Sequence, residues 1–214
     1  MIGNDIVDFA QAAKDSNWRR RGWLDKIFVP EEQELIANAM NPDCMVWLLW
    51  SMKEAAYKAH QRVERHLPRY NPKSFVCALK TLGTHNSGQA ESAGVVKVDK
   101  HCYQTKSTIT SSYVHTIASL TIFSNKGISK TIKNPNTETI FDQLQSNLPQ
   151  SNSNNYKLQK DALGIPQIFD GDCQTSFLIS ISHHGRFGGV FYEPNFFGYK
   201  KTFHFMGRFF RSFI

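Results

Sequence analysis

The sequence predicts an α+β fold in which a helical first part is followed by antiparallel sheets. Three observations carry this prediction: an apolar start, one long amphipathic helix pattern in the first third of the chain, and alternating apolar and polar residues from Ser74 onward. A period near 3.6 residues is typical of helices and a period of two is typical of strands. The chain has 214 residues, 41% of them hydrophobic, which is enough for a packed core.

Residues 2–9 are expected to form a short strand. FVPEEQELIANAM, residues 28–40, predicts a helix, because proline at the first position and acids in the first turn favour a helix start. A second start at Asn41-Pro42-Asp43 leads into a helix of about six turns, CMVWLLWSMKEAAYKAHQRVERH. Its expected buried stripe is Met52, Ala55, Ala56, Ala59 and Val63, and the neighbouring stripe is Trp47, Trp50, Glu54, Lys58 and Gln61.

The alternating pattern predicts strands at 74–82, 93–100, 101–110 and 112–123, bounded by Gly, Asn and Ser clusters. A polar connection, a short helix in TETIFDQLQSNL and the loop QSNSNN follow. After ALGIPQIF, the strand SFLISIS, the turn HHGR and the strand FGGVFYE complete the expected elements. The tail NFFGYKKTFHFMGRFFRSFI is rich in Phe and basic, and three roles stay open for it: covering the core, docking an acidic protein or touching a membrane surface.

The composition indicates the charge of the expected partner and the expected cellular compartment. Lys and Arg number 25 against 18 Asp and Glu, so the net charge is +7, which indicates a polyanionic partner. Nucleic acid, an anionic membrane, an acidic protein and a phosphate-rich small molecule all fit. Cys44, Cys77, Cys102 and Cys173 are scattered without metal-ligand spacing, which predicts reduced thiols in a cytoplasmic protein. The sequence has neither a signal peptide pattern nor about 18 consecutive apolar residues, so we expect no secretion and no membrane span.

Two acidic residues, Asp5 and Glu54, are candidates for a functional site. An ionised carboxylate in an apolar strand, as at Asp5, costs several kcal/mol unless something compensates it. Glu54 and Lys58 lie one turn apart, and such a pair is usually an ordinary solvated ion pair, but here two tryptophans beside it favour partial burial. If Asp5 and Glu54 converge, their repulsion calls for a hard cation such as Mg²⁺, and Lys58 would face the same phosphates. For Asp8 we expect a role as a cap at the strand end.

A second candidate site lies near the end of the chain. Ser182, His183, His184 and Arg186 are hydrogen-bond donors in a turn that contains Gly185. Such a turn favours an anion-binding concavity at a strand end. A surface turn without a ligand is the alternative.

Together these stretches resemble a known family. GNDIVD resembles the opening G-x-D-I/V-x-D/E of the 4'-phosphopantetheinyl transferases, and KEAAYKA resembles their K-E-A-x-x-K-A helix. SISH after GIP resembles their G-K-P followed by S/N-I-S-H, and FVPEEQELI resembles the preceding helix of the holo-(acyl carrier protein) synthase branch. The resemblance covers residues 1–120 and 155–195, and three motifs in one chain make a strong signal.

The resemblance implies a Mg²⁺-dependent enzyme that moves the phosphopantetheine arm of coenzyme A onto a serine of an apo acyl carrier protein and releases adenosine 3',5'-bisphosphate. It implies that Asp5 and Glu54 bind Mg²⁺, with Glu54 also a candidate base, and that Lys58 holds the diphosphate. The implied coenzyme A contacts are Gly164, Ile165 and Pro166 along the adenine and Ser182, His183 and Arg186 at the phosphates. Positioning and charge neutralisation are what phosphoryl transfer needs.

The chain departs from the family pattern in informative ways. Ile165 stands where lysine is usual, Val7 where the larger branch is acidic, and Asp8 where the smaller branch often has glutamate. The metal motifs come first and HHGR comes last, the reverse of the larger branch. We therefore expect a monomeric pseudo-dimer of two α/β halves with the site between them: residues 1–130, with the metal motifs and the long helix, and residues 131–214, with the coenzyme A motifs.

Two other functions remain open. A non-enzymatic nucleic-acid-binding module is compatible with the positive charge and the aromatics, although the basic residues are spread along the chain. A catalytically silent transferase-like protein is compatible with Ile165. Which carrier protein is served, for fatty acid, polyketide or peptide synthesis, is also open.

Overall fold

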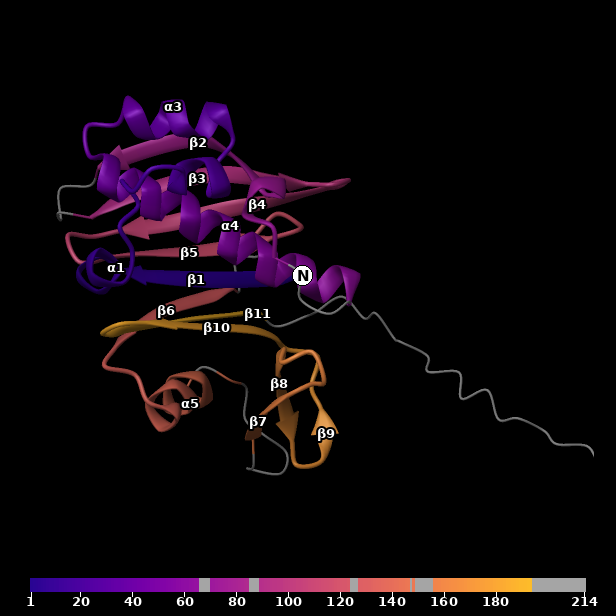
Figure 1. The fold of residues 1–214 in the computed structure, drawn as a ribbon. Helices are drawn as coiled ribbons and strands as arrows, with labels where there is room; N and C mark the ends of the chain where they lie inside the picture. The colour runs from indigo at the N-terminus through magenta and orange to yellow at the C-terminus, as the bar shows by residue number, and fades with distance from the viewer. Residues whose placement is uncertain (66–69, 85–88, 124–126, 147, 149–155, 194–214) are drawn as a thin grey trace, which may run out of the picture.

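The structure, a computed structural model, describes residues 1–65, 70–84, 89–123, 127–146, 148 and 156–193 (Figure 1). The described strands form three antiparallel sheets with the orders β1-β5-β4-β3-β2, β10-β11-β6 and β7-β8-β9. The five-stranded sheet contains β1 (Ile2–Asp8), β2 (Val76–Thr84), β3 (Ala90–Val98), β4 (His101–Ile109) and β5 (Tyr113–Ser119). The other two contain β6 (Ile128–Lys133), β10 (Leu178–His184) and β11 (Phe187–Glu193), and β7 (Tyr156–Lys160), β8 (Pro166–Asp170) and β9 (Cys173–Gln174).

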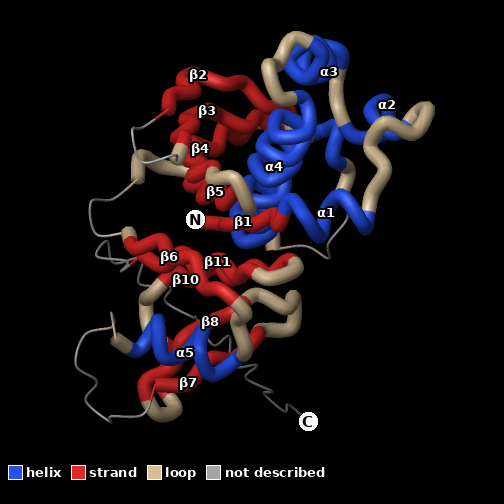
Figure 2. Tube along the Cα trace, turned by 90° about the vertical axis from the view of Figure 1, so that its left-hand side faces the viewer, coloured by secondary structure: helices blue, strands red, loops and turns tan. Residues whose placement is uncertain are grey.

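The helices gather mostly in the first part of the chain. They are α1 (Phe9–Asp15), α2 (Trp23–Ile27), α3 (Pro30–Ala37), α4 (Pro42–Glu64) and α5 (Thr137–Gln145), with a short 3-10 turn at Pro72–Ser74. Figures 1 and 2 show α4 lying across one face of the five-stranded sheet, while α5 lies with the two smaller sheets. No helix in the described part of the chain is long and apolar enough to cross a membrane.

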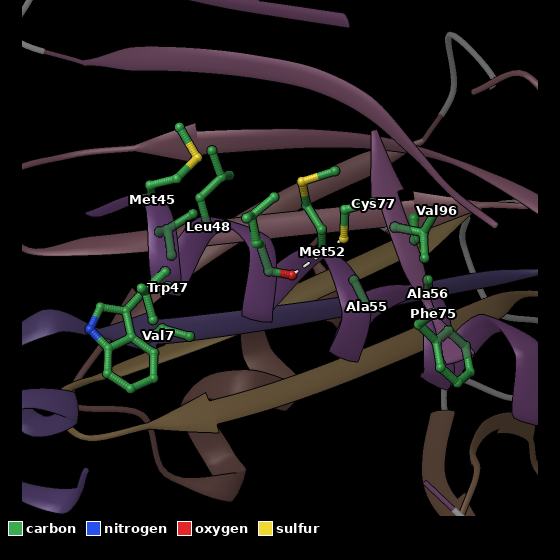
Figure 3. Packing of buried hydrophobic residues seen from close by; sticks show 14 of the residues in the cluster. Val7, Met45, Trp47, Leu48, Met52, Ala55, Ala56, Phe75, Cys77 and Val96 are labelled. Carbon is green, nitrogen blue, oxygen red and sulfur yellow. Dashed lines mark hydrogen bonds between the residues drawn. The ribbon is translucent and has the colours of Figure 1, made fainter. Parts of the chain in front are cut away.

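Helix α4 forms because its ends are capped and one face is apolar. The Asn41 side chain accepts a hydrogen bond from the Cys44 backbone N–H, and Arg65 ends the helix in a left-handed conformation with φ 52°. Met52, Ala55, Ala56 and Ala59 are fully buried, as the sequence predicts, against Phe75, Cys77 and Val96 (Figure 3). Val63, expected in the same stripe, is only half-buried. The neighbouring Arg62 is buried instead. Its guanidinium donates a hydrogen bond to the Ile179 carbonyl at 2.6 Å, which compensates for its burial.

Strand β1 passes so close to α4 that only glycine fits at position 3. A Cβ at Gly3 would lie 2.1 Å from the Ala55 carbonyl oxygen and 2.7 Å from the Ala59 nitrogen. This close approach determines how near Asp5, two residues further along β1, lies to the helix.

Strand β10 runs along the edge of β1 that β5 leaves open (Figures 1 and 2). Its side chains accept hydrogen bonds from the β1 backbone: Ser180 Oγ from the Asn4 N–H at 2.9 Å and His184 Nδ1 from the Asp8 N–H at 3.0 Å. The Asn4 amide also donates to Ser182 Oγ at 3.0 Å. Residues more than 170 positions apart in the chain thus meet at one sheet edge.

The predicted strands and the three predicted helices are confirmed, whereas α1, α2, β6, β7, β8 and β9 were not anticipated. The predicted turn HHGR is shorter than expected, because β10 continues through His184. Helix α1 begins because Asp8 caps it, its carboxylate accepting from the Ala10 N–H at 3.0 Å. The expected boundary between residues 130 and 131 falls inside β6, which pairs with β11.

The four cysteines are free thiols. The loop QSNSNN and the Phe-rich tail lie outside the described residues.

Candidate active site

Two carboxylates and one lysine meet where β1 crosses α4. Asp5 is 9% exposed, and its Oδ1 lies 3.2 Å from Lys58 Nζ. Its Oδ2 is buried without a hydrogen-bond partner, which is unusual for a buried carboxylate oxygen. Asp5 and Glu54 line one cavity of about 310 Å³ together with Trp23 and Trp50. The structure therefore brings Asp5, Glu54 and Lys58 close together, and their roles stay a prediction.

Burial changes the pKa of both carboxylates. Burial raises the pKa of Asp5, and Lys58 partly opposes this. Burial, reinforced by the charge of Asp5, raises the pKa of Glu54 from 4.5 to about 7. A raised carboxylate pKa means that the charged form lacks stabilising contacts.

This environment fits a hard cation. The unpartnered Asp5 Oδ2 and the destabilised Glu54 carboxylate are oxygen ligands of the kind that Mg²⁺ takes, with waters and phosphates completing its shell. Two further positions of β1 add no ligand. Val7 packs in the core beside Trp47 (Figure 3), and Asp8 is bound elsewhere.

Both histidines of the HHGR turn line the same cavity as Asp5 and Glu54. They differ in their surroundings because neighbouring strand residues point to opposite sides. His183 is exposed, whereas the His184 Nδ1 accepts from the Asp8 N–H and its Nε2 lies 3.4 Å from Asp15. His184 thereby ties β10 to β1 and α1, and His183 is the imidazole open to a ligand.

Ser182 and Arg186 lie away from the cavity lining. Ser182 is buried between the sheets, where its Oγ accepts from the Asn4 amide and lies 3.5 Å from the Gly189 carbonyl. The Arg186 guanidinium donates to both oxygens of Asp8, at 2.8 and 2.7 Å, and holds the pKa of that carboxyl well below its usual range. The structure thus gives both residues a role in joining the two parts of the chain, and their contact with coenzyme A stays a prediction.

The GIP loop lies at the C-terminal end of α4. The Gln61 side chain donates to the Leu163 carbonyl at 3.2 Å, and Arg65 pairs with Asp161 at 3.2 Å. The Asp161 carboxylate accepts from the Ile165 N–H and so closes the turn, in which Gly164 has φ +76°. The Ile165 side chain is buried, and Pro166 starts β8. Since α4 rises about 1.5 Å per residue, Gln61 lies about 10 Å along the helix from Glu54.

Two residues near the site were given no role by the sequence analysis. Lys53, the first residue of KEAAYKA, is fully buried in an ion pair with Glu32 at 2.8 Å and also donates to the carbonyls of Pro72 and Phe75. Tyr70 packs edge-on against Trp50, and its hydroxyl is buried without a hydrogen-bond partner. Burial and the charges of Glu54 and Asp5 raise the pKa of Tyr70. Only the folded chain brings this residue to the carboxylates.

The comparison with protein families agrees with these motifs. The model of the 4'-phosphopantetheinyl transferase superfamily matches residues 1–118, which is more than half of the chain. That segment contains Asp5, Glu54 and Lys58 and ends within β5. No curated protein matches the chain.

Proposed function

Because the chain belongs to the 4'-phosphopantetheinyl transferase superfamily, we propose that it transfers the 4'-phosphopantetheine group from coenzyme A to a serine of an apo acyl or peptidyl carrier protein. In this reaction the serine oxygen bonds to the β-phosphorus of coenzyme A. The bond from that phosphorus to the adenosine side breaks, and adenosine 3',5'-bisphosphate leaves. Within this proposal the protein is a holo-(acyl carrier protein) synthase type of enzyme.

The position of Asp5 and Glu54 on one cavity, with Lys58 paired to Asp5 at 3.2 Å, supports this proposal most directly. Mg²⁺ bound by Asp5 and Glu54 would neutralise charge on the diphosphate. Lys58 supplies a positive charge beside the same carboxylates, and its one-turn spacing from Glu54 aims both groups at a common ligand. Glu54 is our candidate for the base that accepts the serine proton, because a pKa of about 7 suits proton transfer near neutral pH.

The order of groups along α4 supports an extended pose of coenzyme A. The carboxylates lie near the middle of the helix, and the GIP loop lies two turns further toward its C-terminal end. We propose that the adenine lies along Gly164, Ile165 and Pro166 while the phosphates reach Lys58 and His183. Ile165 is buried, so the adenine contacts would come from the backbone of this loop rather than from a side-chain amine.

The same proposal assigns a different set of ligand contacts to each of the two parts of the chain. Residues 1–130 would supply the metal ligands and residues 131–214 the coenzyme A contacts, with β6 assigned to the second part because it pairs with β11. The carrier protein would be an acidic partner, which the net charge of +7 favours.

The direct test is an incubation of the purified protein with coenzyme A, Mg²⁺ and a panel of apo carrier proteins, read by intact-protein mass spectrometry. We expect one carrier to gain one phosphopantetheine group, and removal of divalent cations by a chelator to stop the gain until Mg²⁺ is restored. Glu54→Gln should lower the rate by about 10²- to 10⁴-fold, the usual contribution of a general base. Asp5→Ala should also abolish transfer.

The matched control is Glu34→Gln, the same substitution at an exposed position of α3. It should leave the rate unchanged. Near-normal turnover of Glu54→Gln would overturn the assignment of Glu54. Absence of a mass gain on every carrier, with coenzyme A binding intact, would favour the catalytically silent alternative.

A further inference from the structure

A second group of ligand-type side chains lies at the far end of α4, outside the candidate active site. His60, Glu64 and His101 each bring one ligand atom, and these atoms all lie within 4.8 Å of one another. His60 and Glu64 are one turn apart on α4, and His101 is the first residue of β4. The cluster therefore joins the end of the helix to the β3–β4 hairpin.

We propose that His60, Glu64 and His101 form a binding site for Zn²⁺, or for a transition metal of similar ligand preference. Two imidazoles and one carboxylate are a ligand set that Zn²⁺ accepts, whereas Mg²⁺ prefers oxygen ligands alone. The site is thus chemically distinct from the carboxylate pair proposed to bind Mg²⁺.

The state of each imidazole supports ligation. The His101 Nε2 lies 3.7 Å from Glu64 Oε1, too far for a hydrogen bond, and its Nδ1 is buried without a hydrogen-bond partner. The His60 Nδ1 lies 3.0 Å from the Tyr103 hydroxyl. A hydrogen bond on Nδ1 holds the ring in place and leaves Nε2 to face the metal, which is the usual arrangement of a metal-binding histidine.

A fourth ligand is within reach. The Asp99 carboxylate in the β3–β4 turn lies 4.0 Å from His60 Nε2 and is 78% exposed, so it is free to rotate. Tetrahedral ligands about 2.1 Å from Zn²⁺ lie about 3.4 Å from each other, so the present spacings need only a small contraction. The C-terminal end of a helix also carries partial negative charge, which favours a cation there.

The expected consequence is a cross-link between α4 and the hairpin that stabilises the native chain. Any ligand that binds only the folded state raises its stability. The metal would hold the end of α4 that carries Gln61 and Arg65, the residues in contact with the GIP loop.

The test is titration of the full chain with Zn²⁺ in the presence of excess Mg²⁺ and without coenzyme A or carrier protein, by calorimetry and by the visible absorption of Co²⁺ in the same site. His101→Ala should lose one bound ion per chain relative to wild type, and Glu64→Gln should weaken its binding. Tyr103→Phe should weaken affinity by about 10- to 100-fold, the usual effect of losing a partner of a metal-binding histidine. The matched control is His183→Ala, which removes a histidine from the cavity of the candidate active site and should bind this ion as wild type does.

Two results would overturn the proposal. One is a wild-type chain that binds no Zn²⁺ at micromolar concentration. The other is His101→Ala and Glu64→Gln chains that bind as wild type does. Glu64 is exposed, so Glu64→Gln keeps the test valid even where His101→Ala does not fold. Because transfer activity is not the readout, failure of this proposal is distinguishable from failure of the transferase proposal.

Discussion

At the scale of single residues, the surroundings of Glu54 disfavour its charged form, and a bound cation would stabilise that form. Glu54 has a pKa of about 7 in the folded chain against an ordinary value of 4.5, because burial and the neighbouring Asp5 disfavour its charge. Between these two pH values the folded state binds more protons at this position than the unfolded state does. The free energy of unfolding therefore falls as pH rises through this window.

Glu54→Gln should remove this pH dependence. At pH 8 the variant should be more stable than wild type by at most about 3 kcal/mol, and near pH 4 the two should be similar, since Glu54 is then neutral in both states. Urea unfolding at both pH values measures this difference. Mg²⁺ should reduce it by stabilising the wild-type carboxylate, and Glu34→Gln serves as the control. A wild type that is more stable than Glu54→Gln at pH 8 without Mg²⁺ would contradict the assignment.

At the scale of elements, the site depends on how closely β1 and α4 approach. A Cβ at Gly3 would meet the Ala55 carbonyl oxygen at 2.1 Å, which is backbone and cannot rotate away. β1 would have to move away from the helix, and Asp5 would move with it.

Gly3→Ala should therefore lower both stability and metal binding. We expect a loss of stability of at least about 1–3 kcal/mol, the usual cost of overpacking. Thermal unfolding followed by circular dichroism measures it. Gly83→Ala in β2 is the matched control, because a Cβ there meets nothing within 4 Å. Equal stability of the two variants would show that β1 does not pack against α4 as described.

At the scale of the whole molecule, the edge of β1 is covered by the chain itself. Side chains of β10 accept from its backbone, and a Cβ at Gly189 in β11 would lie 2.6 Å from His115 Nε2 in β5. The buried His115, with its pKa lowered to about 4 by burial, accepts from the Asn4 amide as a neutral imidazole. An edge covered in this way does not need a second copy of the chain.

We therefore predict a monomer in solution. Light scattering across a wide concentration range should give the mass of one chain, 24.5 kDa, with and without coenzyme A. A trimer that persists at low concentration would contradict this prediction.

The sequence by itself determined the local features of this protein. The caps and apolar stripe of α4, the alternation in β2 to β5 and the motif residues Asp5, Glu54 and Lys58 all depend on neighbours within a few residues, and a single sequence contains that information. The family resemblance that these motifs carry was confirmed for residues 1–118.

Only the tertiary structure decided the long-range partners. The binding of Arg186 to Asp8, the burial of Ser182 against Asn4, the approach of Tyr70 to the carboxylates and the meeting of His60 with His101 join positions far apart in the chain. Side-chain period and propensity carry no information about such contacts, because they arise from how whole elements pack. The same turn that suggested four phosphate donors therefore supplies one exposed histidine, while its other polar side chains hold two sheets together.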